Sequence, residues 1–276
     1  MNPEIFELDL TRPRVMAIVN VTPDSFYAGS RTFTAPEIER RVITAADEGA
    51  YMLDVGGYSS RPGADDVSAA EEFARVARAL EVIRRRLPAM PVSVDTFRSD
   101  VVRRVVAEFG PVVVNDISAG ALDPAIVDAA AELRLPYIAM HMRGTPATMQ
   151  SLTRYDDVTD EVVGYFRHRL TELHARGIRQ IVLDPGFGFA KTLEQNYELL
   201  GGLHRLCELG CPVLSALSRK SMIYKALECT PAESLAGTVA LGWESLRQGA
   251  SLLRVHDVKE AADTVRIFEI YNRERR

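Results

Sequence analysis

The tetrapeptide IVLD (181–184) is a short apolar run that ends on an acidic residue, and the glycine-punctuated segment PGFGFAK (185–191) follows it directly. A buried strand needs the apolar residues, but it does not need a carboxylate at its end. Seven further runs share this design. They are VMAIVN (15–20), YMLDV (51–55), PVSVD (91–95), VVVND (112–116), YIAMH (137–141), PVLSALS (212–218) and SLLRVH (251–256). Apolar strands that alternate with helical segments predict βα units and a parallel sheet.

Eight such units fit a closed (β/α)8 barrel, because that fold typically needs about 250 residues and the chain has 276. No composition shift or linker divides the sequence, so we expect a single TIM-barrel domain over residues 1–276. In this fold the carboxyl ends of all strands meet at one end of the barrel, here called the mouth, where the active site lies. The polar residues at the strand ends should therefore converge there.

Helices should connect the strands, and several carry capping signals. Thr34 and Glu37 match a capping box, Ser68 precedes another acidic first turn, and glycines stand at the ends of several helices, for example Gly49. Residues 3–12 should form a short hairpin that closes the bottom of the barrel. The expected helices are 35–49, 68–87, 98–109, 124–134, 157–176, 193–209, 221–228, 231–248 and 258–272.

Composition narrows the function. A net charge of -5 and a pI near 5.7 argue against a general nucleic-acid binder. No apolar stretch reaches the roughly 18 residues of a membrane span, and the N-terminus does not look like a signal peptide. The three cysteines, Cys207, Cys211 and Cys229, cannot form a disulfide framework. We therefore expect a cytoplasmic protein with no membrane or nucleic-acid partner.

Acids and one amide end the strands that should line the mouth. Asp95, Asn115 and Asp184 are strand-end residues, and Asp54 belongs to the same mouth. Each alone could instead cap the following helix. Together they suit a planar heterocycle with several N–H donors, because a carboxylate accepts two parallel hydrogen bonds from an amino-imino edge.

The first and last strands offer groups for an anion. Arg254 and His256 come from the last strand, and Asn20 comes from the first strand, its neighbour in a closed ring. A cation, an imidazole and an amide fit a phosphate-type ligand, with or without a divalent metal. An ion pair with a neighbouring acid such as Asp257 is the alternative role for Arg254.

Two loops supply further candidates. In SRKS (218–221), Lys220 can point into the mouth and Ser221 opens a helix, whose N-terminus suits a carboxylate or phosphate. Arg219 is equally compatible with a surface or loop-anchoring role. In DPGFGFAK (184–191), Phe189 is a candidate binding surface, whereas Phe187 fits a buried turn better. Histidines in helical segments should be surface residues; they are His168, His174 and His204.

Taken together, eight segments resemble dihydropteroate synthase, from the first strand to the final helix. They are NVTPDSF (20–26), DVGGYSSRPGA (54–64), VSVDTFR (92–98), VNDISAG (114–120), MHMRGTPATMQ (140–150), LDPGFGFAK (183–191), LSRKSMI (217–223) and RVHDV (254–258). The order and spacing of these long motifs are those of the family.

The resemblance implies a (β/α)8 fold and a defined reaction. The family condenses 6-hydroxymethyl-7,8-dihydropterin diphosphate with 4-aminobenzoate, which gives 7,8-dihydropteroate and diphosphate, and sulfonamides imitate 4-aminobenzoate. It also implies Mg2+ as cofactor and a homodimer. The matched pterin positions are Asp95, Asn115, Met140, Asp184 and Lys220; the diphosphate and Mg2+ region is Asn20, Arg254 and His256; and the aminobenzoate side is Ser60, Arg61, Pro62, Phe189 and Ser221.

Some positions depart from the family pattern. Ala28 stands where the resemblance implies an acid that faces the developing pterin cation, which leaves Asp24 as the candidate in that loop. Tyr58 stands for the usual Glu, Ser60 for the usual Thr, and Ala216 for a common Gly. These changes concern loop details and the choice of the acid that supports the cation.

The residue inventory suits an SN1-like substitution in which Asp95 and Asp184 favour a pterin cation while Arg254 and His256 stabilise the leaving diphosphate. Catalytic roles are therefore expected for Asp95, Asp184, Lys220, Arg254 and His256. One alternative is a pterin-binding methyltransferase domain, which would keep the acids but would not need NVTPDSF, SRPG or SRKS. The other is a non-catalytic pterin-binding paralogue, suggested only by the change at Ala28.

Overall fold

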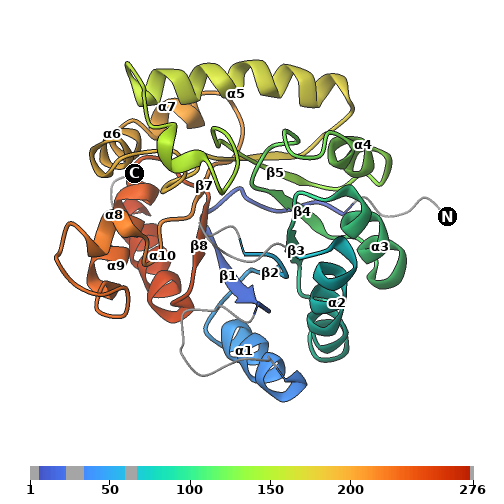
Figure 1. Ribbon diagram of the computed structural model, residues 1–276. Coiled ribbons are helices and arrows are strands. Elements are labelled where there is room, and N and C mark those ends of the chain that lie inside the picture. The colour runs from blue at the N-terminus through green and yellow to red at the C-terminus, as the bar shows by residue number, and fades with distance from the viewer. Residues whose placement is uncertain (1–5, 23–33, 60–66, 274–276) are drawn as a thin grey trace.

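The computed structural model describes residues 6–22, 34–59 and 67–273, and its eight parallel strands form a barrel inside a ring of helices (Figure 1). The strand order is β6-β5-β4-β3-β2-β1-β8-β7, and a parallel bridge between Leu183 and Val213 closes the ring. The predicted TIM barrel is confirmed. The strands are β1 (Arg14–Asn20), β2 (Met52–Gly56), β3 (Val92–Asp95), β4 (Val113–Asp116), β5 (Tyr137–Met140), β6 (Ile181–Asp184), β7 (Leu214–Ser215) and β8 (Leu252–Val255).

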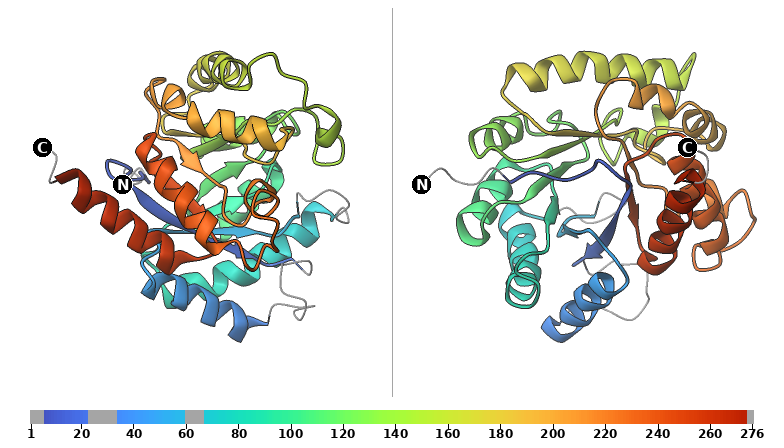
Figure 2. Two further views of the ribbon diagram at one scale, coloured as in Figure 1. Left: turned by 90° about the vertical axis from the view of Figure 1, so that its left-hand side faces the viewer. Right: turned by 180° about the vertical axis from the view of Figure 1, so that it is seen from behind.

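The helices cover the outside of the barrel between consecutive strands. Figure 2 shows that the connection over residues 142–156 extends from the barrel on the side away from the end of the last helix. The helices are α1 (Ala35–Asp47), α2 (Ala69–Arg86), α3 (Ser99–Phe109), α4 (Ala125–Glu132), α5 (Val158–Ala175), α6 (Leu193–Gly201), α7 (His204–Cys207), α8 (Ser221–Tyr224), α9 (Leu235–Arg247) and α10 (Val258–Arg273), with a 3-10 turn at Met149–Ser151.

Three expected helices differ from the observed ones. The segment 193–209 is broken into α6 and α7 around Gly202, which packs so closely on α5 that a Cβ there would lie 2.5 Å from Thr159 Cγ2. The helix expected over 221–228 ends at Tyr224, and Glu228 has a positive φ of 51° that reverses the chain. The segment expected from 231 becomes helical only at Leu235.

The predicted helix ends are otherwise confirmed. Ser68 Oγ accepts a hydrogen bond from the Glu71 amide at 3.2 Å, and the Glu37 carboxylate accepts one from the Thr34 amide at 2.8 Å. Both bonds satisfy amides that a helix start leaves without partners. Gly49 follows α1 with a φ of 100°, the left-handed conformation in which glycine is preferred.

The N-terminal segment closes the bottom of the barrel, but not as a hairpin. Residues 6–13 contain no strand, since the Leu8 backbone is bonded to the Gln180 side chain at 2.9 and 2.7 Å instead of to a second strand. Leu8 and Leu10 are buried against inward-facing residues of the barrel such as Met16 and Met52. The predicted closing role is therefore confirmed, and the predicted hairpin is wrong for the residues that the structure describes.

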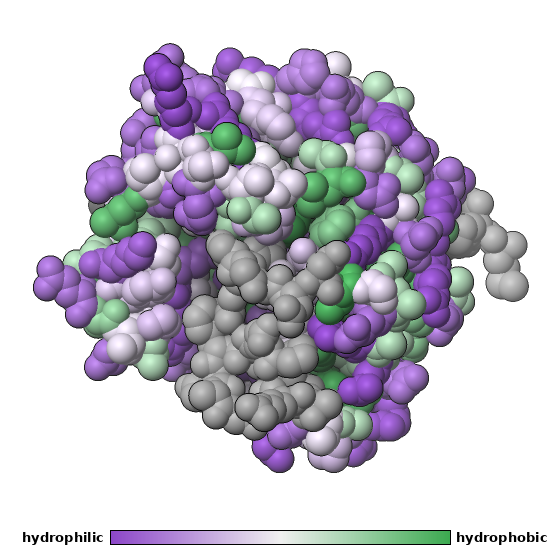
Figure 3. All heavy atoms as spheres, in the orientation of Figure 1, coloured by the Kyte–Doolittle hydropathy of each residue, from purple (hydrophilic) through white to green (hydrophobic). Residues whose placement is uncertain are grey.

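Apolar side chains fill the space between strands and helices, in one cluster around α4 to α7 and another around α1 to α3 and α10. The periphery of the face in Figure 3 is largely hydrophilic. Among the described residues, no helix is both long enough and apolar enough to cross a membrane. The core thus fixes the strands, and the strands fix the residues at their carboxyl ends.

Candidate active site

Strand register aligns the predicted residues at the carboxyl ends of neighbouring strands. Asn20 pairs with Gly56, Gly56 pairs with Asp95, and Asp95 pairs with Asn115, on four successive strands. Met140 pairs with Asp184 on the next two strands. A side-chain carbon at Gly56 would lie 3.4 Å from Asn20 Oδ1 and 3.7 Å from Asp95 Oδ2. The glycine therefore leaves space where these two side chains converge.

Asp54 lies one layer below, on β2, and its buried carboxylate connects several of these residues. It accepts a hydrogen bond from Ser93 Oγ, two bonds of 3.2 and 3.3 Å from Asn115 Nδ2, and one of 2.6 Å from Arg254 Nε. These bonds use the amide nitrogen of Asn115. Its amide oxygen therefore remains to accept a donor from a ligand.

Arg254 lies between two acids. Its guanidinium contacts Asp54 Oδ2 at 2.6 Å and Asp95 Oδ2 at 2.8 Å. Burial opposes the charge, but Asp54 and Asp95 together raise the pKa of Arg254 above its ordinary value. The alternative ion pair with Asp257 does not form, because Asp257 binds Arg219 at 2.8 Å through both carboxylate oxygens.

Arg219 anchors a loop instead of facing a ligand. Besides Asp257, its guanidinium donates to the carbonyl oxygens of Pro231 and Ala232 at 2.7 and 2.6 Å. It thus connects the segment after β7 to the start of α10 and to the turn before α9. Of the two roles left open for Arg219, the structure supports the anchoring one.

The two acids assigned to the pterin side have shifted pKa values. Burial raises the pKa of Asp95 to about 7, with Asp54 adding to the rise and Arg254 opposing it. Burial also raises the pKa of Asp184, opposed by Lys220 and by the Gly186 amide, which donates to Asp184 Oδ1 at 2.8 Å. A ligand with several N–H donors would favour the charged form of both carboxylates.

Lys220 and Phe189 meet at the other side of the mouth. Lys220 Nζ donates to the Phe187 carbonyl at 2.6 Å and lies 5.0 Å from the ring centre of Phe189. Burial lowers the pKa of Lys220 to about 8, although Asp184 opposes this. Phe187 is fully buried in the core and Phe189 is half-buried, as predicted. Ser221, also half-buried, is the first residue of α8.

His256 directly follows β8 in a partly buried position, where its backbone amide donates to Ser218 Oγ at 3.2 Å. Burial, aided by Arg254 and Arg41, lowers the pKa of His256 to about 4. The imidazole is therefore neutral at pH 7 in the free protein. It could donate a hydrogen bond to an anion, whose negative charge would in turn favour its protonation.

Several candidates lie outside the described residues, namely Ser60, Arg61, Pro62, Asp24 and Ala28. The nearest described departure from the family pattern is Tyr58. Its ring packs edge-on against Phe97 with centroids 5.3 Å apart, and the Arg98 guanidinium lies 5.2 Å from it. Tyr58 thus belongs to a cation–aromatic cluster at the mouth. Ala216, the other described departure, directly follows β7 and is buried in the barrel interior.

Some residues that shape the mouth carry no signal in the sequence. Arg41 on α1 donates to the carbonyls of Ile18 and His256 at 3.1 and 2.9 Å, so it joins the ends of β1 and β8. Asp116 accepts bonds from Tyr137, Ser118 and Gly120 and shapes the turn after β4. The helical histidines are exposed, as expected. Only three-dimensional contacts identify Arg41, because nothing in its sequence neighbourhood distinguishes it.

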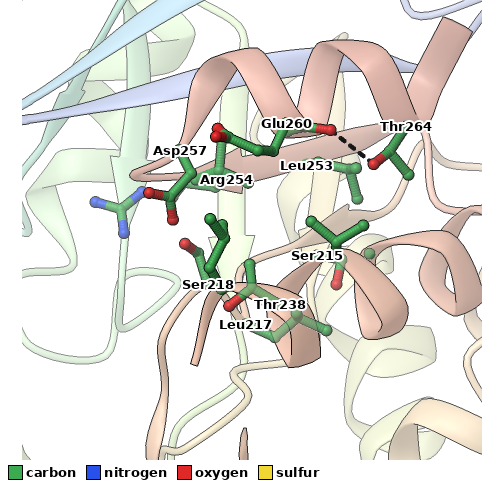
Figure 4. Close-up of a pocket in the computed structure, with 14 residues that line it drawn as sticks. Ser215, Leu217, Ser218, Thr238, Leu253, Arg254, Asp257, Glu260 and Thr264 are labelled. Carbon is green, nitrogen blue, oxygen red and sulfur yellow. Dashed lines mark hydrogen bonds between the residues drawn. The ribbon is translucent and has the colours of Figure 1, made fainter. Parts of the chain in front are cut away.

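Two further concave regions are a small cavity beside β7 and β8 and a groove at the barrel bottom. A cavity of about 20 Å³ lies between α9, α10 and the strands β7 and β8, and most of its lining is apolar (Figure 4). It has room for about one water molecule. A groove of about 320 Å³ lies at the barrel bottom, lined by residues such as Phe6, Arg134 and Gln180. Neither holds the strand-end polar residues together.

The comparisons with known proteins fit this geometry. A family model described as pterin binding enzyme matches residues 16–256. The dihydropteroate synthase of Escherichia coli (strain K12) is 42% identical over 264 residues, which is 95% of this chain and 93% of that protein. The chain belongs to the dihydropteroate synthase family.

Solved structures of the family have the same architecture. A Xanthomonas albilineans dihydropteroate synthase with 4-aminobenzoic acid has a TM-score of 0.87 and 42% identity, covering 95% of this chain and 94% of that one. A Yersinia pestis dihydropteroate synthase with a sulfonamide drug has a TM-score of 0.91 and 37% identity, covering 99% and 98%. This chain is thus a dihydropteroate synthase, a transferase of folate biosynthesis.

Removing Arg254 should destabilise the synthase. Arg254→Ala leaves Asp54 and Asp95 without their cation, which should lower the free energy of unfolding by about 3 kcal/mol at pH 7. The loss should be smaller at pH 5, because a buried acid with a raised pKa binds a proton more readily in the folded state, so that acid pH favours folding. Urea denaturation at both pH values measures this. An equal loss at pH 5 and 7 would contradict it, and Arg254→Lys, which keeps the charge, is the control.

Asp184→Ala should weaken pterin binding about ten- to hundredfold, because it removes charge-assisted hydrogen bonds worth roughly 1.5–3 kcal/mol. Calorimetric titration with 7,8-dihydropterin measures the affinity. Asp100→Ala on the exposed face of α3 is the matched control. Unchanged affinity in a folded Asp184→Ala variant would remove this residue from the pterin site.

Proposed function

We propose that this synthase joins 6-hydroxymethyl-7,8-dihydropterin diphosphate to 4-aminobenzoate, releasing diphosphate and giving 7,8-dihydropteroate. The observation that carries the proposal is the convergence of Asp95, Asn115, Asp184 and Lys220 beside the buried Asp54–Arg254 pair. Each of these groups can bind a chemical group of one of the two substrates. The reaction itself is that of the dihydropteroate synthase family, to which the chain belongs.

The pterin ring would lie between the acids of β3 and β6. Asp184 has one carboxylate oxygen on the Gly186 amide, and its other oxygen can accept from the amino-pyrimidinone edge. The Asn115 oxygen and Asp95 can accept further ring N–H groups, and Lys220 can donate to a ring oxygen or nitrogen. Met140 is buried beside Asp184 and would pack against the ring.

The acids would also lower the barrier of the reaction. When the C–O bond to diphosphate breaks, its electron pair leaves with the diphosphate and positive charge develops on the pterin methylene and ring. Asp95 and Asp184 would stabilise that charge in a buried site, where such interactions are strong. The neutral arylamine then forms the C–N bond and loses a proton, so that no strong base is required.

The leaving diphosphate is assigned to the ends of β1 and β8. Arg254 and His256 would stabilise its charge, and the Asn20 oxygen would be a ligand for Mg2+. One protein oxygen suits this ion, which often keeps several waters and takes further oxygens from substrate phosphates. The described residues contain no cluster of three or more His, Cys, Asp or Glu side chains that could hold a metal alone. Bound Mg2+ would neutralise charge on the leaving group.

The aminobenzoate would bind beside Phe189 and Ser221. Phe189 offers an aromatic face near Lys220, and the Ser221 hydroxyl offers a donor for the carboxylate. Because α8 has only four residues, this hydroxyl and the nearby Lys220 carry the assignment more than a helix dipole does. Ser60, Arg61 and Pro62 are proposed to complete this side.

Turnover of both substrates is the direct test. Purified protein with Mg2+ should form 7,8-dihydropteroate and one equivalent of diphosphate, and excess chelator should reduce the rate at least about tenfold because the leaving charge is no longer neutralised. Chromatographic detection of the product measures this. A non-catalytic paralogue would bind pterin without product, and a methyltransferase would consume methyltetrahydrofolate instead. Either result would overturn the proposal.

We further propose a cytoplasmic homodimer. Its interface is assigned to α9 and α10, where Ile267, Ile270 and Tyr271 are exposed by 59%, 51% and 44%. The i, i+3, i+4 spacing of these residues puts them on one face of α10, and Tyr271 packs edge-on against Trp243 of α9 with ring centroids 5.6 Å apart. Exposed apolar faces of this kind mark association surfaces. The three free cysteines support a reducing compartment.

The double change Ile267→Asp and Ile270→Asp should convert the dimer to a monomer, because two carboxylates would be buried without partners in the interface. Light scattering coupled to size-exclusion chromatography measures the mass. Leu152→Asp, at an apolar residue exposed by 40% in the 142–156 connection, is the matched control. A wild-type mass of about 31 kDa, the mass of one chain, would contradict the dimer.

A further inference from the structure

Lys191, at the end of the loop after β6, is a buried cation that the reaction does not use. Only 6% of the residue is exposed. Its Nζ lies 3.0 Å from the Gly186 carbonyl, 3.0 Å from the Phe189 carbonyl and 3.1 Å from His141 Nδ1. The ammonium group has three N–H donors, and each finds one acceptor.

His141, at the end of β5, can serve as the third acceptor because it is neutral. Burial, aided by Lys191 and Arg143, lowers the pKa of His141 to about 2. Its Nδ1 then accepts the bond from Lys191, and the proton of the neutral ring is on Nε2. Lys191 thereby joins the end of β5 to two points of the loop after β6.

That loop carries two groups of the proposed site. The amide of Gly186 donates to Asp184, and Phe189 faces Lys220. The loop crosses β5 so closely that a Cβ at Gly186 would lie 2.1 Å from the His141 carbonyl oxygen. The Phe187 carbonyl, which lies between the two Lys191 acceptors, is bound by Lys220 instead. Two lysines therefore bind different carbonyl groups of the same loop.

Asn196 on α6 also holds this loop by hydrogen bonds, but without a charge. Its Oδ1 accepts from the Gly188 amide at 2.7 Å, and its Nδ2 donates to the Thr192 carbonyl at 2.5 Å. The side chain is buried, with 2% exposure. It supports the loop as Lys191 does, but it does not titrate.

We propose that the protonated Lys191 is a positioning residue that fixes the loop over residues 185–190, so that Asp184 and Phe189 are held for the pterin and the 4-aminobenzoate, and that its deprotonation loosens this loop. The inference rests on the proposed function of the site. A neutral amine has only two N–H groups and one lone pair, so it cannot serve all three acceptors.

The charges around Lys191 place its titration in an accessible range. Burial lowers the pKa of Lys191 to about 7, opposed by Asp184 on β6, while Lys220 after β7 and Arg143 after β5 lower it further. The three hydrogen bonds of the Lys191 ammonium are present below this pKa, and the full set is lost as the pH rises through it. Asp95 and Lys220 also titrate near neutral pH, so the test uses variants that leave both in place.

The test is the ratio of wild-type to variant kcat/KM for 4-aminobenzoate between pH 6 and 9, because titrations common to both proteins cancel in this ratio. For Lys191→Met we expect a ratio of about 10 at pH 6, carried mainly by a higher KM, that falls towards about 1 at pH 9. Asn196→Leu should give a ratio that does not change with pH. Lys225→Met, at an exposed lysine, should give a ratio of about 1 throughout.

His141→Phe provides a second, independent variant. It removes one acceptor of the ammonium and should lower the pKa of Lys191, so that the fall of activity with pH begins at a lower pH than in the wild type. This outcome supports the proposal even if Lys191→Met fails to fold.

A ratio for folded Lys191→Met that stays constant with pH, or a His141→Phe profile that matches the wild type, would overturn the inference. Failure of the proposed function is distinguishable, because the wild-type protein itself would then form no 7,8-dihydropteroate.

Discussion

The buried carboxylate of Asp54 is the interaction on which the site depends. It lies inside the barrel and receives donors from Ser93, Asn115 and Arg254, which come from three different strands. A charge buried in this way is costly unless it is paired and fully hydrogen-bonded. The same bonds that satisfy Asp54 also fix the orientation of the Asn115 amide and the position of the Arg254 guanidinium.

This arrangement leaves the mouth ready for its ligands. Arg254 balances Asp54 and Asp95, and Lys220 lies near Asp184, yet burial still raises the pKa of both site acids. A pterin that donates hydrogen bonds and develops positive charge would lower the free-energy cost of keeping these two buried carboxylates charged. With the proposed roles, the site would bind the pterin and stabilise its developing charge through groups that are already held in place, which is the condition for electrostatic catalysis.

Much of the fold followed from local patterns. Apolar runs that alternate with capped helices predicted the barrel, and Ser68 and Gly49 lie at helix ends as expected. The errors lie where tertiary contacts override a local signal. Gly202 interrupts an expected helix where it packs on Thr159, and the N-terminal segment is bound by the Gln180 side chain in place of a hairpin partner. No local pattern contains either partner.

The sequence by itself determined which residues end the strands, because strand periodicity and the barrel rule place Asn20, Asp95, Asn115 and Asp184 in one mouth. The motifs around them determined the family. Only the tertiary structure decided which groups are paired: Arg254 binds Asp54 and Asp95, Asp257 binds Arg219, and Lys191 binds His141. The physical reason is that ion pairs and hydrogen bonds depend on distances of about 3 Å, and strand register and loop path set those distances between residues far apart in the chain.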